Sequence, residues 1–465
     1  MFTDAGRSKT LASLVAAALV LVSCDGGGGT GSTTPRATAP RVSAAPTSTT
    51  PATTPSSSGG TAATGGTTSG WTVNTSSCPD PARVGKAITG TITIGTAAPL
   101  TGGPAAAFGP VKDGFVAYIK YASDNGLLPG YTLSTDVRDD QYDPGQTPAV
   151  VDGLIADGAD LFAGIIGTPN NLAVRDTLNQ ACIPQLAALT GAPVWGQIAD
   201  YPWTTGGTVP YDVEASIYAA KLAELKAGAT VALFYVSSDF GKAYADAFKK
   251  QAADLGLQVV DEQTIEADAT DPPTSQVAAM AGKLPDAIIA SPLGLQCPAF
   301  LNELANAKTQ AAGWAPMVFL TNTCASKLFL GLAGTAAEGV YTSSNLLDAN
   351  DPKNAAAPGV KTFLETVAAA KLPGDPGVVE VGWNAGEATV AILNAALKSG
   401  TLSRKSIIEA ARTLTFTPSL ARPSVQYKMS GDADPFAFQT LQVLQWSTAS
   451  QTFAEIGDPI TQFES

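Results

Sequence analysis

The sequence predicts an α/β protein with two lobes, each built on a parallel β-sheet that helices cover on both faces. From residue 88 onward, short runs rich in β-branched residues alternate with amphipathic helical stretches. Strand, helix and strand in this order favour parallel sheets covered on both faces. Roughly 370 residues follow this pattern, which is more than one hydrophobic core usually holds, so two lobes are expected.

The expected elements follow one another in regular order. The first strand is expected at 88–95 and the first helix at 108–123, whose apolar residues recur on one face. A break at 205–207 separates two similar series of units, and residues 339–341 indicate another crossing between the lobes. The apolar face of the first helix consists of Phe115, Tyr118, Ile119 and Ala122. The remaining strands are expected at 131–137, 161–166, 184–188, 231–236, 257–260, 287–291 and 317–320.

The first 24 residues have the features of an export signal with a lipid attachment site. Two basic residues precede an apolar run at 11–22. This run is too short to span a bilayer, which takes about 20 residues. Residues 21–24, Leu-Val-Ser-Cys, resemble the bacterial lipobox, which implies cleavage before Cys24 and lipidation of its thiol. We therefore expect residues 1–23 to be a signal peptide and the mature chain to be lipid-anchored on the extracytoplasmic face of the bacterial cell membrane. The alternative is a secreted protein with a chance cysteine at this place.

Residues 24–77 have the composition of a flexible tether. They consist mainly of Ser, Thr, Pro, Gly and Ala, which cannot bury a core. A flexible chain of about 50 residues has a root-mean-square reach of about 40 Å, enough to hold a domain clear of a membrane.

The charge and composition exclude several classes of function. The chain carries a net charge of −13 and no histidine. No nucleic-acid partner is expected, because no basic segment would attract phosphates. Imidazole-dependent triads and metal sites are excluded, and we expect no metal, no cofactor and no enzymatic activity. Nucleophile-elbow and phosphate-loop motifs are also missing from fitting contexts.

Four cysteines beyond Cys24 suit an oxidising compartment and permit three pairings. We favour Cys78 with Cys182 and Cys297 with Cys324. The alternative is that some of them are buried free thiols. Their wide and irregular spacing argues against a zinc site.

An ordered set of short motifs resembles the type I periplasmic binding proteins. The set comprises Ile-Thr-Ile-Gly at 92–95 with Pro-Leu-Thr-Gly at 99–102, Val-Arg-Asp-Asp at 137–140, Ile-Ile-Gly at 165–167, residues 235–241 and Glu-Gly-Val-Tyr at 338–341. Among these proteins the sequence is most similar to leucine-isoleucine-valine-binding proteins, the solute-binding subunits of ABC importers. The resemblance implies two Rossmann-like, doubly wound lobes joined by a three-crossover hinge, with a small molecule in the cleft. We expect an N-terminal lobe at 78–208 plus 342–424 and a C-terminal lobe at 209–341 plus 425–460.

Candidate ligand contacts in the first lobe follow two apolar strands, because ligands of doubly wound sheets lie beyond the carboxyl ends of strands. Asn170 and Asn171 follow the first of these strands, and the alternative is that they cap their own helix. Ala188 and Thr190 follow the next strand, where the resemblance implies binding by a hydroxyl and backbone groups. An ordinary turn threonine is the alternative.

Candidates in the second lobe are Asp239, Gln296 and Tyr341. Asp239 either meets a ligand ammonium or caps a helix. Gln296 lies in the loop 292–296, where amino-acid-binding relatives often carry an acid that this chain lacks. A desolvated ammonium needs a countercharge, and Glu380 is the candidate substitute. Tyr341 is expected in an apolar cleft wall or in the core, as are Trp195, Trp203 and Tyr211.

These features together predict a solute-binding lipoprotein. It would capture a small polar or amphipathic molecule, a branched-chain amino acid, an amide or an organic acid, by closing its lobes. Delivery to an ABC permease is the expected role, and a ligand-sensing receptor that signals to a membrane partner is the alternative.

Overall fold

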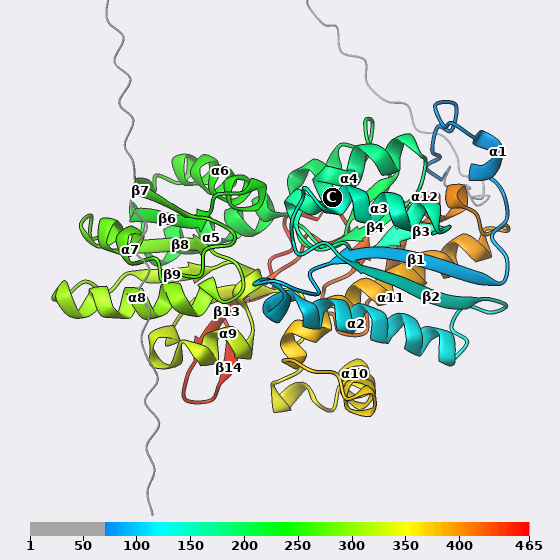
Figure 1. Ribbon diagram of the computed structural model, residues 1–465. Helices are drawn as coiled ribbons and strands as arrows, with labels where there is room; N and C mark the ends of the chain where they lie inside the picture. Colours follow the sequence, from blue (N-terminus) through cyan, green and yellow to red (C-terminus); the bar gives the residue numbers. More distant parts are fainter. Residues whose placement is uncertain (1–69, 465) are drawn as a thin grey trace, which may run out of the picture. The chain divides into compact units, whose positions relative to one another are not determined.

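The computed structural model describes residues 70–464 (Figure 1). The expected signal peptide, the lipid attachment site at Cys24 and the tether up to residue 69 lie outside these residues. Residues 70–77, expected to belong to the tether, pack on the folded part instead: Val73 is buried and the Trp71 indole donates a hydrogen bond to Asp432. Within 70–464, no helix is both long and apolar enough to cross a membrane.

The first sheet has five parallel strands in the order β2-β1-β3-β4-β5. Its central strands β3 and β4 are short and wholly buried, as expected for a parallel sheet with both faces covered. The strands are β1 (Thr91–Ala98), β2 (Thr132–Asp139), β3 (Leu161–Ala163), β4 (Gln185–Ala188) and β5 (Thr204–Gly206).

The helices of the first lobe include one from late in the chain. Helices α2 and α11 lie side by side (Figure 1), and two glycines allow the close approach. A Cβ at Gly382 would lie 1.7 Å from the Val111 carbonyl oxygen, and one at Gly114 would lie 2.0 Å from that of Val379. The expected apolar face of α2 is confirmed as buried. The helices are α1 (Pro81–Val84), α2 (Ala105–Asp124), α3 (Thr147–Ala156), α4 (Thr168–Gln180), α10 (Pro358–Ala370), α11 (Pro376–Lys398) and α12 (Arg404–Ala411).

The second sheet has seven strands in the order β14-β13-β10-β9-β8-β6-β7. Strands β6 to β10 pair in parallel, whereas β13 and β14 add an antiparallel edge. The strands are β6 (Thr230–Val236), β7 (Gln258–Ile265), β8 (Ala287–Ser291), β9 (Met317–Leu320), β10 (Tyr341–Ser344), β13 (Gln442–Ser447) and β14 (Thr452–Glu455). The helices are α5 (Tyr211–Leu225), α6 (Asp239–Asp254), α7 (Thr274–Ala281), α8 (Gln296–Gln310) and α9 (Lys327–Leu332).

The chain passes between the two lobes three times. The first crossing follows β5, the second follows β10, and the third lies between β12 and β13. Strands β11 (Thr415–Phe416) and β12 (Tyr427–Lys428) form a small antiparallel pair before the third crossing. Short 3-10 helices cover Pro193–Gly196, Asn322–Cys324, Gly334–Ala337 and Pro352–Asn354. The expected α/β fold of two Rossmann-like lobes joined by three crossovers is therefore confirmed.

Both expected disulfides are present. The Cα atoms of Cys78 and Cys182 are 5.7 Å apart, and those of Cys297 and Cys324 are 5.9 Å apart. The first bond fastens the start of the described chain to the end of α4, and the second joins the start of α8 to the segment after β9.

Candidate functional site

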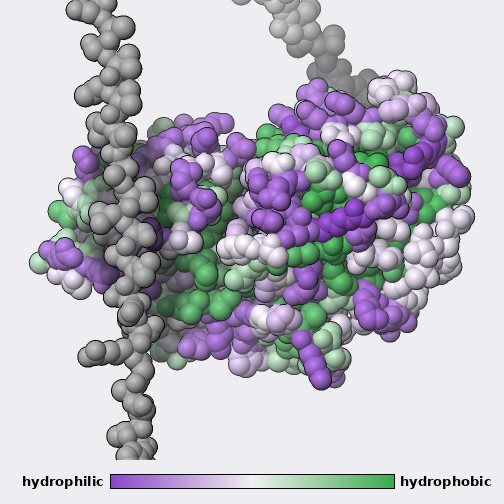
Figure 2. Space-filling model, in the orientation of Figure 1, coloured by the Kyte–Doolittle hydropathy of each residue, from purple (hydrophilic) through white to green (hydrophobic). Residues whose placement is uncertain are grey.

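A cavity of about 160 Å³ lies between the two lobes, where strands of both sheets end. In the space-filling view, hydrophobic residues gather where the lobes meet (Figure 2). The first lobe contributes residues of α2, of the loops after β3 and β4, and of α11, and the second lobe contributes residues after β9. Two of the crossovers complete the wall. The principal lining residues are Phe108, Val111, Leu189, Thr190, Tyr211, Asn322, Thr323, Ser326, Phe329, Leu346, Glu380 and Asn384.

Thr190 presents a buried hydroxyl to the cavity from the loop after β4. It is 1% exposed, and its Oγ1 lies 2.6 Å from Oγ1 of Thr168, the first residue of α4. The Tyr211 hydroxyl lies 3.4 Å from both oxygens, and burial raises the pKa of this phenol. Three hydroxyl groups thus meet at the carboxyl ends of β3 and β4. Two of them, those of Thr190 and Tyr211, belong to residues that line the cavity, where a polar ligand group can exchange hydrogen bonds with them.

Asn170 and Asn171 do not line this cavity, because their side chains turn into the first lobe. The Asn170 amide donates to Asp140 at 3.0 Å and to Thr147 at 2.9 Å. The Asn171 amide donates to the carbonyl oxygens of Ile165 and Gly167 at 2.8 and 2.9 Å. Both asparagines brace the loop that carries Thr168.

Ala188 also lies behind the cavity wall. Its carbonyl oxygen accepts hydrogen bonds from the backbone N–H groups of Thr190 and Gly207, at 2.8 and 2.9 Å. It thereby fixes the loop of Thr190 against the first crossover.

Helix α11 brings Glu380 and Asn384 to the cavity, one helical turn apart. Glu380 is 6% exposed, and its Oε2 accepts a hydrogen bond of 3.0 Å from the Ala349 N–H. Burial raises the pKa of Glu380 well above its ordinary value, and the neighbouring carboxylate of Asp348 raises it further. Asn384 is 4% exposed, and its Oδ1 has no hydrogen-bond partner within the described chain. No Lys or Arg is found among the described residues that line the cavity.

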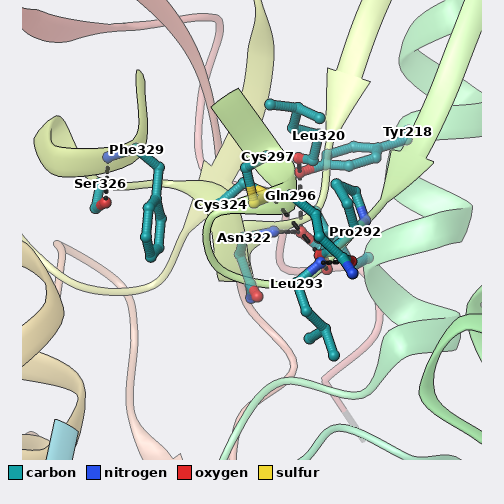
Figure 3. Close-up of a disulfide and its surroundings, with 12 residues drawn as sticks. Tyr218, Pro292, Leu293, Gln296, Cys297, Leu320, Asn322, Cys324, Ser326 and Phe329 are labelled. Carbon is teal, nitrogen blue, oxygen red and sulfur yellow. Dashed lines mark hydrogen bonds between the residues drawn. A yellow bond between two sulfur atoms is a disulfide. The ribbon is translucent and has the colours of Figure 1, made fainter. Parts of the chain in front are cut away.

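The second-lobe wall is the segment from Asn322 to Ser326, together with Phe329 from α9. The Ser326 hydroxyl accepts a hydrogen bond from the Phe329 N–H and so caps α9. Cys324, in the middle of the segment, is held to Cys297 (Figure 3). A disulfide therefore ties this wall to the start of α8.

A second cavity of about 280 Å³ adjoins the first, and both are lined by Ala107 and Phe108. The Phe108 ring stacks on that of Tyr142, with ring centres 5.3 Å apart. Gln296 lines this second cavity, but its side chain already bonds within the second lobe. Its amide donates to the Glu266 carbonyl at 2.8 Å, and its Oε1 accepts from the Leu293 N–H at 3.1 Å.

The remaining expected site residues line neither cavity. Asp239 is an exposed residue in the first turn of α6. Tyr341 stacks on Phe319 in the second sheet, with ring centres 4.7 Å apart. Trp195 and Trp203 are buried in the first lobe.

Sequence reasoning missed Phe108, Asn384 and the segment 322–329 as cavity residues. A signal for Asn384 existed, because an acid and an amide one turn apart interrupt an apolar helix. The segment 322–329 carries no comparable pattern.

Comparison with known proteins agrees with this geometry. Residues 91–451 match the sequence model of a family described as periplasmic binding protein. Leu/Ile/Val-binding protein homolog 2 of Brucella abortus is 26% identical over 168 residues, which are 36% of this chain and 45% of that protein. The chain thus aligns with less than half the length of this relative.

Two solved structures have the same fold. A branched-chain amino acid ABC transporter protein from Thermus thermophilus with bound valine superposes with a TM-score of 0.71 and 19% identity, over 80% of this chain and 97% of that one. A fatty acid ABC transporter substrate-binding protein from Thermomonospora curvata gives a TM-score of 0.68 and 21% identity, over 82% and 95%. Since the family match spans most of the sequence and the two lobes enclose a cleft, this chain belongs to the periplasmic binding protein family, whose members bind rather than transform their ligands.

Proposed function

We propose that this protein captures a small molecule between its lobes outside the cytoplasm and delivers it to an ABC permease. The observation that carries the proposal is the cavity lined by both lobes and by two of the crossovers between them. A ligand that touches both lobes stabilises the closed arrangement over the open one, so binding and hinge closure are coupled. Lipidation of Cys24 and the tether would keep the receptor near its permease.

The proposed ligand is a small amphipathic molecule, of the branched-chain amino acid, amide or organic acid class. Apolar side chains, among them Phe108, Val111 and Phe329, offer contacts to a hydrocarbon body. Polar groups also line the cavity, among them the hydroxyl of Thr190, the carboxyl of Glu380 and the amide of Asn384. The relatives named for valine and for a fatty acid support this range of ligands.

Glu380 is the proposed partner of a ligand amine. Among the described residues that line the cavity, Glu380 is the only acid. A buried ammonium needs a countercharge, and the lining offers no other. An amine-bearing ligand would keep Glu380 ionised, whereas an organic acid would require it to hold its proton.

A thermal-shift screen with matched compounds tests the proposal. Leucine, leucinamide, 3-methylbutylamine and 4-methylpentanoate share a branched body and differ in their polar groups. A compound at 100 times its Kd stabilises the folded state by about 2.7 kcal/mol. We expect at least one compound of the three proposed classes to stabilise the protein, and a screen of these classes without any stabilising compound would contradict the proposal.

A further inference from the structure

Glu214 is a buried acid that lines neither of the two cavities described above, yet its carboxylate accepts hydrogen bonds from three separate elements. It lies on α5 and is 1% exposed. Its Oε1 accepts hydrogen bonds from the Asn322 N–H at 2.7 Å and the Ser343 hydroxyl at 2.8 Å, and the Tyr218 hydroxyl lies 2.9 Å from it. The Thr321 hydroxyl donates to Oε2 at 3.2 Å.

These partners lie at the moving parts of the proposed mechanism. Helix α5 begins directly after the first crossover, where the Tyr211 N–H donates to the Gly191 carbonyl of the first lobe. Ser343 is in β10, which ends where the second crossover begins. Asn322 starts the segment that forms the second-lobe wall of the cavity, beside the Cys297–Cys324 disulfide (Figure 3). One carboxylate therefore connects two crossovers with a ligand-facing wall.

No Lys or Arg of the described part of the chain pairs with this carboxylate. None of the ion pairs formed by the described residues involves Glu214. The titratable groups that face it are phenols, Tyr211 and Tyr218 on α5 and Tyr244 on α6. Its other partners, directly after β9 and in β10, are hydroxyls and a backbone amide. Burial raises the pKa of Glu214 to about 7, although the donors from Ser343, Tyr218 and Asn322 lower it.

We propose that Glu214 is a positioning residue that fixes segment 321–326, which contains the second-lobe wall of the cavity, relative to two crossovers, and that protonation of its carboxylate weakens this hold. The proposal rests on the proposed binding function. Hydrogen bonds to an ionised acceptor are roughly twice as strong as those to a neutral one, so the protonated acid holds the Asn322 N–H and the Ser343 hydroxyl less firmly. Ligand affinity would then fall as the surroundings become acidic.

Hydrogen–deuterium exchange of the ligand-free protein tests this directly. Segment 321–326 is compared at pH 6 and pH 8 in the wild type, in Glu214→Gln and in Glu387→Gln, after correction for the intrinsic pH dependence of exchange. Glu387 is the control, because its pKa is also raised by burial while it bonds to Ser419, away from β9 and β10. We expect wild-type protection to be about tenfold lower at pH 6, low at both pH values in Glu214→Gln, and of wild-type form in Glu387→Gln.

A second variant keeps the proposal testable if Glu214→Gln fails to fold. Ser343→Ala keeps the carboxylate but removes a donor that favours its charged form, so the midpoint of the protection profile should move to higher pH. Protection of the wild type that does not change with pH, wild-type protection in Glu214→Gln, or an unchanged midpoint in Ser343→Ala would overturn the proposal. Because the measurement needs no ligand, its failure is distinct from a screen in which no compound binds.

Discussion

Replacing Gly294 with alanine should hold the two lobes apart. Gly294 lies in the second-lobe loop between β8 and α8, and Ala107 lies on α2 of the first lobe. A Cβ at Gly294 would be 2.7 Å from the Ala107 Cβ, 0.7 Å inside the 3.4 Å at which ordinary contacts begin. Ala107 lines both cavities, so this contact forms where the lobes close around a ligand.

The substitution has two separable effects on free energy. Gly294 has a φ of +52°, so alanine there destabilises the fold by roughly 1–2 kcal/mol whether the lobes are open or closed. Overpacking against Ala107 costs about 1–3 kcal/mol more, and only when the lobes close. This second effect should weaken ligand affinity by about 5- to 150-fold.

Gly334→Ala is the matched control, because Gly334 has a φ of +54° and no atom within 4 Å of its added Cβ. Isothermal titration of both variants with the best compound from the thermal-shift screen separates strain from contact. Both should unfold at lower denaturant concentration than the wild type, but only Gly294→Ala should bind more weakly. Equal affinities of the two variants would refute the reasoning that closure brings Gly294 onto Ala107.

Four further predictions concern the cavity wall and its support. Thr190→Ala should weaken binding by about fivefold with little loss of stability, since one ligand hydrogen bond contributes about 1 kcal/mol. Unchanged affinity in titration calorimetry would exclude this hydroxyl from the site. Glu380→Gln should weaken binding of amine-bearing compounds by about tenfold or more and spare the matched organic acid, with the two Kd values measured side by side. Replacing Cys297 and Cys324 with serine should lower the free energy of unfolding by about 2–5 kcal/mol and should also weaken ligand binding. Replacing Cys78 and Cys182 should lower the free energy of unfolding alone, as measured by denaturation and binding assays on both variants. Burial raises the pKa of Glu214 to about 7, so the folded protein retains a proton between pH 4.5 and 7 that the unfolded chain releases. Stability against global unfolding should therefore fall by up to about 3 kcal/mol as pH rises through this window, opposite in sign to the local hold on segment 321–326, and Glu214→Gln should lack that fall in urea titrations at pH 5 and 7.5.

The strands that the sequence predicts best are those buried on both faces. Strands β8 and β9 are short apolar runs, and their expected and observed bounds agree closely. Strand β7 runs to Ile265, beyond the expected end at residue 260, because its second half is the polar run Asp261–Thr264. This strand lies at the sheet edge and is half exposed, so no apolar pattern marks it.

The antiparallel strands β13 and β14 depend on contacts that local sequence does not encode. Strand β13 pairs with β10, about a hundred residues earlier in the chain. The sequence pattern of residues 442–455 indicates extended structure but not which strand it pairs with. The pairing of β13 with β10 is set by the path of the chain through the hinge.

The candidate site was predictable where the position of a lining residue follows from topology. Thr190 follows a buried strand, and the carboxyl ends of such strands face the cleft, where the structure places this residue. Asn170 occupies an equivalent position after β3, but its partners are Asp140, directly after β2, and Thr147, the first residue of α3. The same amide chemistry suits a helix cap, a ligand contact and an internal brace, so only the fold decides among them.

Small-angle X-ray scattering with and without a stabilising compound tests the central claim most directly. The protein that begins at residue 25 is measured at saturating and zero concentrations of each compound that raises its melting temperature. Closure of two lobes on a ligand predicts a reproducible fall in the radius of gyration with every such compound. A radius of gyration that stays constant for all of them would contradict capture by lobe closure.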